Sequence, residues 1–362
     1  RDFLQLNNLQ TNNPDIDDRL VFDELLPDIK KYFLESSPNA NSSDLWVRRM
    51  EKSKNLFLKK NELNKDFFRN FRSIRKRLIA DTPKSRNFFE NFFYRHDVEQ
   101  AKFQFRKVLS EDGFSKSTML KTMEKFKFDL VGNPGYIIDS NYIYSERYIR
   151  HCYYINLFEN FISPKLKRER YFLFDIGGGY GIFDNFILKL DKKIKPIIVD
   201  FPEQLFTASY YLKMNNPDIK INNISECMNT KVISKEYLDN FDACLIPAEK
   251  FQNIKVNENI IITNFNSFGE ISIKVLNEYQ NSYAFSNLDF IFTHNRLDAF
   301  PTYEDKVSIF DYKLERYNCI LKEMSPIHDY VYQKKGLFSL KKVPFGSRCF
   351  TYIGSSKNIN EI

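Results

Sequence analysis

Four of the eleven glycines in this 362-residue chain fall within five positions, in the stretch DIGGGYG from Asp175 to Gly181. An apolar segment typical of a strand precedes the stretch, and one typical of a helix follows it. Glycine suits a sharp strand-to-helix turn, and its missing Cβ lets a ligand lie against the backbone. Backbone N–H groups at the helix start attract electron-rich ligand atoms. The stretch therefore predicts a ligand-binding turn.

Two common phosphate-binding patterns do not fit this turn. A dinucleotide turn requires G-x-G-x-x-G, but from Gly177 the third glycine falls at Ile182, and from Gly178 the second falls at Tyr180. No Gly-Lys-Ser or Gly-Lys-Thr follows, so the P-loop pattern is absent as well. The opening acid, Asp175, repels a pyrophosphate and suits a ligand with an ammonium group or hydroxyl donors.

A second acidic residue, Asp200, closes the next apolar segment 25 residues after Asp175. An acid at this position accepts hydrogen bonds from both hydroxyls of a ribose, and Phe201 beside it offers a surface for an adenine. Alone, Asp200 is weak support, because aspartates often cap elements at strand ends. Together with Asp175 and the glycines it predicts a nucleoside-type ligand.

These motifs resemble those of the class I S-adenosylmethionine-dependent methyltransferases. Asp175 to Gly181 is similar to their first motif, and Asp200 to their ribose-binding acid. VDFPE is similar to the Asp-Leu-Pro of small-molecule O-methyltransferases, with Phe201 replacing Leu. Residues 131–300 also resemble a bacterial family named as sugar O-methyltransferases. That likeness rests on VGNP, DIGGGYG, IVDFPEQLFTASYYL, ITNFNSFGEIS and FIFTHNR, although Ile271 stands where the family commonly has Met.

The resemblance implies methyl transfer from S-adenosyl-L-methionine to a hydroxyl of a sugar or glycoconjugate precursor, with S-adenosyl-L-homocysteine as the product. The acceptor is expected to be a small molecule or carbohydrate, such as a precursor of capsule or surface polysaccharide. Contacts to the adenine are expected from the end of the third strand. The cofactor-binding set is therefore Asp175, Gly177, Gly178, Gly179, Tyr180, Gly181, Asp200, Phe201, Pro247 and Ala248.

Methyl transfer to a hydroxyl needs a positioned base, because the nucleophilic oxygen must lose its proton. His294, at the end of the fifth strand segment, is the leading candidate, with a structural histidine as the alternative. Glu270 is the second candidate, or else a helix-terminal acid. His96 and His151 precede the sheet-forming region, and His328 lies in a loop of uncertain position.

The loops after the fourth and fifth strands also supply candidate substrate-binding residues. Asn264 and Ser267 either bind substrate or cap the next helix. Asn295 and Arg296 follow His294, and Arg296 suits a phosphate or carboxylate, or else a surface ion pair. A Tyr-rich segment with Tyr136, Tyr144, Arg147 and Tyr148 forms either a lid that stacks on a sugar ring or a packing layer between domains.

The elements that must position these residues alternate after residue 170. Apolar strands are predicted at 171–176, 196–200, 242–247, 259–264 and 288–294, with helices at 202–215 and 269–285. Short apolar strands between helices indicate an α/β fold with a mostly parallel, Rossmann-like sheet covered on both faces. The segments 310–321 and 347–356 are expected to form an antiparallel edge.

Residues 1–130 have helical periodicity, notably at 17–36, 42–60 and 65–83, and form a predicted helical N-terminal region. The turn cluster VGNPG introduces the methyltransferase-like domain, residues 131–362, through the Tyr-rich segment and a helix ending near Ser163. The N-terminal helices are expected to form a homodimer contact.

Charge and cysteine usage exclude several classes of protein. The net charge of +7 comes from 54 basic and 47 acidic residues spread along the chain, so nucleic acid is not an expected partner. The densest basic patch, RSIRKR at 72–77, is interpreted as a solvated helix face. Five scattered cysteines without a CxxC pair favour reduced thiols in a cytoplasmic protein. No metal site is predicted, and no apolar run is long enough to span a membrane.

Two other functions remain open. A nucleic-acid methyltransferase would share the fold, but no Asn-Pro-Pro-Tyr-like tetrad follows the fourth strand, where NFNS stands instead. A non-catalytic module would keep Asp175, the glycines and Asp200 while lacking a usable base. Replacing His294 and Glu270 with alanine separates an enzyme from such a module.

Overall fold

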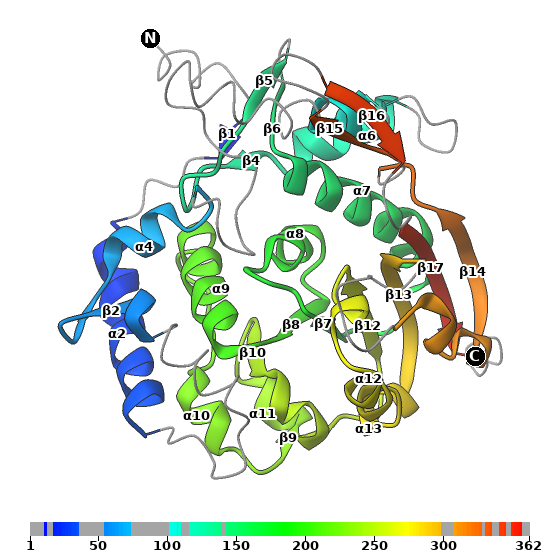
Figure 1. The fold of residues 1–362 in the computed structure, drawn as a ribbon. Helices are drawn as coiled ribbons and strands as arrows, with labels where there is room; N and C mark the ends of the chain where they lie inside the picture. Colours follow the sequence, from blue (N-terminus) through cyan, green and yellow to red (C-terminus); the bar gives the residue numbers. More distant parts are fainter. Residues whose placement is uncertain are drawn as a thin grey trace.

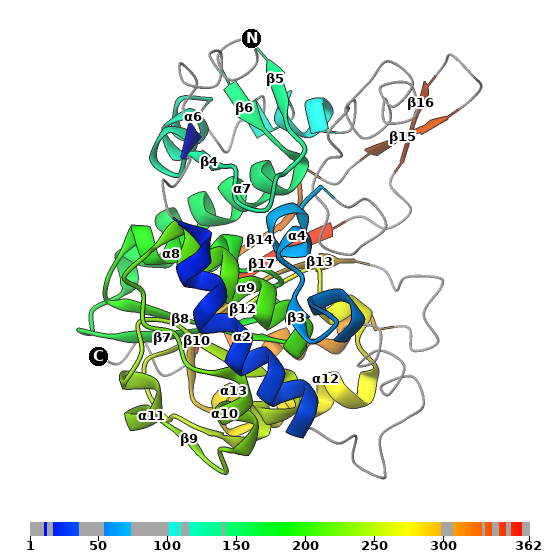
Figure 2. The ribbon, with the colours of Figure 1, turned by 90° about the vertical axis from the view of Figure 1, so that its left-hand side faces the viewer.

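The computed structural model describes residues 11–12, 17–35, 54–73, 101–106, 108–109, 116–139, 142–297, 307–327, 330–334, 340–344 and 349–356. A seven-stranded sheet crosses the centre of the molecule, with helices on both faces (Figure 1). In the view turned by 90°, helix α2 lies across the front of the sheet region (Figure 2). No helix among the described residues combines the length and apolar character needed to cross a membrane.

The central sheet confirms the predicted α/β class. Its order is β10 (Cys244–Pro247), β8 (Ile194–Asp200), β7 (Tyr171–Ile176), β12 (Ile260–Phe265), β13 (Leu288–Arg296), β17 (Cys349–Ser356) and β14 (Tyr317–Met324). The first five strands are parallel, as their continuous apolar runs predict. β17 is antiparallel to both of its neighbours, so the antiparallel strand lies one position inside the edge that β14 forms.

Two predicted elements differ from the structure in extent. The strand predicted over 310–321 begins only at Tyr317, because two 3-10 turns, η4 (Ile309–Asp311) and η5 (Leu314–Arg316), come first. The helix predicted over 269–285 is divided into η3 (Phe268–Glu270), α12 (Ile273–Gln280) and α13 (Tyr283–Ser286). Ser272 and Ser282 cause the division, since each caps a new helix by accepting a hydrogen bond from a backbone N–H.

Each face of the sheet has its own apolar core. On one face, Leu173, Ile198 and Ile261 pack with helices α7 (Glu146–Phe161), α8 (Ile182–Leu190) and α9 (Pro202–Asn215). On the other, Phe174 and Ile262 pack with α11 (Lys235–Asp239), α12 and α13. All six residues of β7 are buried, as a central strand covered on both faces requires.

The N-terminal residues contribute helices, as predicted, and α2 (Asp18–Glu35) packs on α9 and α10 (Ile224–Asn229). The apolar face of α2 belongs to the same core as the sheet, with Phe22 stacked on Tyr210 of α9 at 5.3 Å between ring centroids. Asp28 of α2 accepts hydrogen bonds from the backbone N–H groups of Ile224 and Ser225, both 2.8 Å. The predicted homodimer contact stays a prediction; within this chain, α9 and α10 cover the apolar face of α2.

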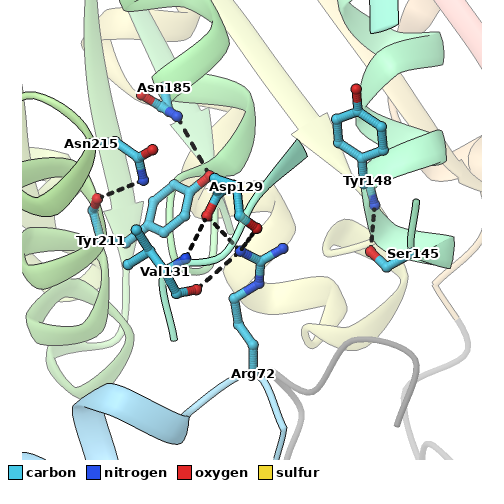
Figure 3. Close-up of polar contacts among 8 residues, drawn as sticks. All are labelled: Arg72, Asp129, Val131, Ser145, Tyr148, Asn185, Tyr211 and Asn215. Carbon is cyan, nitrogen blue, oxygen red and sulfur yellow. Dashed lines mark hydrogen bonds and ion pairs between the residues drawn. The ribbon is translucent and has the colours of Figure 1, made fainter. Parts of the chain in front are cut away.

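A buried polar network joins the N-terminal residues to the sheet region (Figure 3). Arg72 Nη1 donates to Asp129 Oδ1 at 2.6 Å and to the Val131 carbonyl at 3.0 Å. Tyr211 of α9 donates to Asp129 Oδ2 at 2.8 Å. Arg72 is fully buried, so interpreting RSIRKR as a solvated face is wrong for this residue; residues 74–77 lie outside the described residues.

The remaining elements are short or lie away from the sheet. They are β1 (Thr11–Asn12), β2 (Leu58–Lys59), β3 (Glu62–Leu63), α4 (Lys65–Asn70), α6 (Lys116–Lys125), β4 (Phe128–Asp129), β5 (Ile137–Asp139), β6 (Tyr142–Tyr144), η1 (Ser163–Lys165), β9 (Ile233–Ser234), η2 (Ala248–Asn253), β11 (Ile254–Lys255), β15 (Tyr330–Lys334) and β16 (Leu340–Pro344). The end of the helix predicted at 42–60 is strand β2, and most of the rest of that segment lies outside the described residues.

Candidate functional site

The predicted glycine turn lies at the carboxyl end of β7, where the strand order of the sheet changes direction. From β7 the chain adds β8 and then β10 on one side, and later places β12 on the other. Ligands of open α/β sheets bind at such a point, outside the carboxyl ends of the strands. The structure therefore brings the predicted turn, Asp200, and the loops after β12 and β13 to one edge of the sheet.

Three turn glycines have a left-handed backbone, with φ of 74° at Gly177, 61° at Gly179 and 84° at Gly181. A Cβ at Gly177 would overlap the Ser267 hydroxyl, so this glycine lets the loop after β12 approach the turn. A Cβ at Gly179 would meet nothing within 4 Å, so this part of the turn borders open space. A ligand could approach the backbone there, which is the property that the glycines predict.

Asp200 holds the turn in place at the end of β8. One carboxylate oxygen accepts from the backbone N–H of Gly179 at 2.8 Å, and the other from that of Phe201 at 2.7 Å. The register between β8 and β10 pairs Asp200 with Pro247, and Ala248 follows with part of its surface exposed. Asp200, Phe201, Pro247 and Ala248 therefore lie along one stretch of the sheet edge.

The Asp175 carboxyl lies beneath the turn and is only 1% exposed. Thr263 of β12 donates to it at 2.7 Å, and an added Cβ at Gly178 would come within 2.7 Å of its second oxygen. Burial raises the pKa of Asp175 to about 7, and it also raises the pKa of the neighbouring Asp184 carboxyl on α8. Asp175 thus supports the turn from below.

Tyr180, the aromatic residue of the turn, is buried between two arginines from other elements. The guanidinium of Arg72 lies 5.4 Å from the ring centroid and that of Arg147 lies 5.6 Å from it. Both distances allow cation–π attraction. The ring also packs edge-on against Tyr211 at 4.9 Å. The N-terminal residues and α7 therefore form part of the wall behind the turn.

His294, Asn264 and Asn295 are fully buried. The ring of His294 lies 4.8 Å from that of Tyr154, its Nδ1 is 3.0 Å from the Thr351 hydroxyl, and burial lowers its pKa to about 3. Asn264 donates to the Ile176 carbonyl at 2.6 Å and accepts from Asn295 Nδ2 at 2.9 Å. These contacts tie β7, β12 and β13 together at their carboxyl ends.

Glu270, Arg296 and Ser267 are more accessible at the same edge. Arg296 Nη1 lies 3.7 Å from Glu270 Oε1, with 18% and 41% of the two side chains exposed. Burial raises the pKa of Glu270, and the positive charges of Arg296 and Arg147 oppose this shift. Tyr148, by contrast, is a core residue whose hydroxyl donates to the Met123 carbonyl at 3.1 Å. Tyr144 is buried as well, so packing is the role that both tyrosines have here.

One face of helix α7 lies along this edge and was missed by the sequence reasoning. Tyr154 stacks on Phe265, the last residue of β12, at 4.3 Å between ring centroids, and accepts from Asn266 Nδ2 at 3.1 Å. His151 lies beside Tyr154, and Arg147 reaches the turn. Their i, i+4, i+7 spacing was the available signal. His151 was set aside because it precedes the sheet in the chain, and Arg147 was considered only as part of the Tyr-rich segment.

Comparisons with known proteins identify no family. No protein-family model matches the chain, and no curated protein matches it. Among solved structures, it is similar to magnesium protoporphyrin IX methyltransferase (ChlM) from Synechocystis PCC 6803 with bound SAH, at 7% identity and TM-score 0.36, covering 74% of this chain and all of that one. It is also similar to TehB from Haemophilus influenzae, at 10% identity and TM-score 0.34, covering 56% of this chain and 61% of that one.

Within the described residues, no cluster of three or more His, Cys, Asp or Glu side chains could hold a metal.

Proposed function

We propose that the protein is an S-adenosylmethionine-dependent O-methyltransferase that acts on a hydroxyl of a sugar or glycoconjugate precursor. The observation that carries the proposal is the placement of the glycine turn and Asp200 together at the switch point of the sheet. The acceptor class rests on the sequence resemblance. It is supported by the accessible polar groups of Glu270, Arg296 and Ser267 at the same edge.

The residues at this edge fit the cofactor in chemical type. Asp200 is an ionisable acceptor that can bind two ribose hydroxyls, and the partly exposed Phe201 and Ala248 offer apolar surface for the adenine next to the buried Pro247. The open side of the turn at Gly179 exposes backbone to the methionine part. When bound, the cofactor supplies an electrophilic methyl group. The chain's own task is to orient the acceptor oxygen and to remove its proton.

Isothermal titration with S-adenosylhomocysteine tests the cofactor site. The unmodified protein is expected to bind, and Asp200→Asn to bind at least about tenfold more weakly, because hydrogen bonds to a charged group are worth roughly 1.5–3 kcal/mol. Asp218→Asn, an exposed position, is the matched control and should bind normally. No binding by the unmodified protein would contradict the proposal.

The acceptor is tested by methyl transfer from labelled S-adenosylmethionine to a panel of nucleotide sugars and oligosaccharides. Transfer to a member of the panel supports the sugar assignment. Transfer only to RNA or to a non-carbohydrate small molecule would replace it. Cofactor binding without transfer to any acceptor class would favour a non-catalytic module.

A further inference from the structure

Helix α7 presents three side chains toward the edge of the sheet where the cofactor site is proposed. Arg147 reaches Tyr180 of the glycine turn, and Tyr154 stacks on Phe265 at the end of β12. His151 lies between them, one turn after Arg147, with its ring centroid 5.5 Å from that of Tyr154. Because positions spaced by three or four residues share one face of a helix, His151 faces the region between the turn and β12.

The hydrogen bond of His151 fixes which ring nitrogen carries the proton. Nδ1 lies 2.7 Å from the backbone carbonyl of Arg147, and a carbonyl oxygen can only accept. Nδ1 is therefore the donor, and Nε2 of the neutral ring keeps its lone pair. Within the described residues, the imidazole of His151 makes no other hydrogen bond. The residue is partly exposed, whereas His294 is fully enclosed.

The surroundings keep this imidazole neutral at physiological pH. Burial lowers its pKa well below the usual value, and the positive charges of Arg147, Arg150 and Arg72 lower it further, while the bond to the Arg147 carbonyl opposes the shift. Glu146, also on α7, pairs with Arg150 at 3.0 Å. The neutral ring has a lone pair on Nε2 that can accept a proton. Its lowered pKa makes it a weak base, and the nearby cations compensate by stabilising the negative charge that develops on an acceptor oxygen.

We propose that Nε2 of His151, not His294, accepts the proton of the acceptor hydroxyl. This inference rests on the proposed O-methyltransferase function. The acceptor O–H bond breaks and its proton passes to Nε2 while the oxygen forms a bond to the methyl carbon. The methyl–sulfur bond breaks with its electron pair remaining on sulfur, which becomes a thioether. The imidazolium then returns its proton to water.

Two measurements test the histidine without an acceptor. Carbethoxylation by diethylpyrocarbonate, followed by peptide mass mapping, should modify His151 at least about tenfold faster than the enclosed His294. Nitrogen-15 NMR should show the Nδ1–H form of His151, and His151→Asn should remove that signal. A protected His151, or a ring protonated on Nε2 instead, would overturn the proposal.

Kinetics test the role itself, with the acceptor that gives transfer in the screen above. His151→Ala should lower kcat by about 100-fold or more, the usual contribution of a general base, while binding of S-adenosylhomocysteine changes less than about threefold. Added imidazole should restore kcat at least tenfold, an effect that a purely structural defect would not show. Glu159→Gln, a change to a half-buried residue near the end of the same helix that pairs with Lys125, is the control.

The outcomes separate this inference from the function on which it rests. Failure of the unmodified protein to bind S-adenosylhomocysteine would remove the proposed function. Normal binding and transfer, with a His151→Ala variant that keeps more than a third of kcat, would remove only the role of His151. If no acceptor is found, the carbethoxylation rate of His151 and the position of its ring proton decide whether the proposed role of His151 stands.

Discussion

The guanidinium of Arg72 and the carboxylate of Asp129 form a buried ion pair with an Nη1–Oδ1 distance of 2.6 Å, although 57 residues separate them in the chain. Their side chains are 0% and 3% exposed. A buried pair of this kind is sensitive to loss of one partner, because the remaining charge stays buried without compensation. The pair also lies behind Tyr180, so it links the N-terminal residues to the glycine turn.

Replacing Arg72 by Met is therefore expected to lower the free energy of unfolding by about 3 kcal/mol or more, measured by urea denaturation. Arg69→Met is the matched control, since Arg69 pairs with Asp18 at the surface and such pairs contribute about 0–1 kcal/mol. If the two variants lose the same stability, the buried pair does not have the role assigned to it.

The contact between Gly177 and Ser267 gives a second prediction. Gly177→Ala should lower stability more than Gly179→Ala, because both positions have positive φ but only the Cβ at 177 would overlap a side chain. Adding Ser267→Gly to Gly177→Ala should recover part of the loss. Thermal denaturation of the three variants measures the difference. An equal loss for both single variants would show that backbone strain alone matters.

Asp28 gives a third prediction, because it caps α10 from another helix. Asp28→Ala should lower the free energy of unfolding by about 1–2 kcal/mol, the upper range for loss of a helix cap, since two buried N–H groups lose their acceptor. Asp23→Ala, an exposed change on the same helix, should alter it by less than about 0.5 kcal/mol. Urea denaturation at pH 7 measures both free energies of unfolding. Equal losses in the two variants would show that Asp28 does not cap α10.

The buried acids Asp175 and Asp184 make a fourth prediction, on pH dependence. Burial raises both pKa values above the unfolded value of 3.8, that of Asp175 to about 7. Between pH 4 and 7 the folded protein thus holds protons that the unfolded chain releases, so its stability should fall as the pH rises. One proton corresponds to a slope of about 1.4 kcal/mol per pH unit.

Asp184→Asn should reduce this slope, because an amide in place of the carboxyl removes one ionisation. Exposed Asp218→Asn should leave the slope unchanged. Urea unfolding of the three proteins from pH 4 to pH 8 makes the comparison. A slope in Asp184→Asn equal to that of the unmodified protein would count against this pair as its source.

The sequence predicted the central strands closely because their signals are local. The predicted strand at 171–176 is β7, and the predicted helix at 202–215 is α9, with the same bounds. The segment of β7 is almost entirely apolar, and α9 begins at Pro202, a residue favoured at the first position of a helix. The glycine turn was equally predictable, because the positive φ angles at Gly177, Gly179 and Gly181 favour glycine over every other residue type.

The surroundings of the turn were less predictable because they depend on contacts between distant residues. The sequence pattern indicated a surface position for Arg72, because its partner Asp129 lies far along the chain. His151 was set aside because it precedes the sheet, yet α7 returns to the carboxyl edge of β12. Asn264 was interpreted as a substrate ligand or a helix cap, and Asn295 as a substrate ligand. The two bond to each other, and Asn264 also bonds to the Ile176 carbonyl and accepts from the backbone N–H of Phe268, where η3 begins. Local patterns carry no signal for such pairings.

Strand β17 is the last strand of the sheet along the chain, yet it lies between β13 and β14. During synthesis on the ribosome, β13 and β14 must therefore emerge before the strand that joins them. Until β17 arrives, each presents an unpaired edge, which is the feature that promotes association between chains. We therefore expect nascent chains without β17 to aggregate more readily than chains in which the sheet is complete.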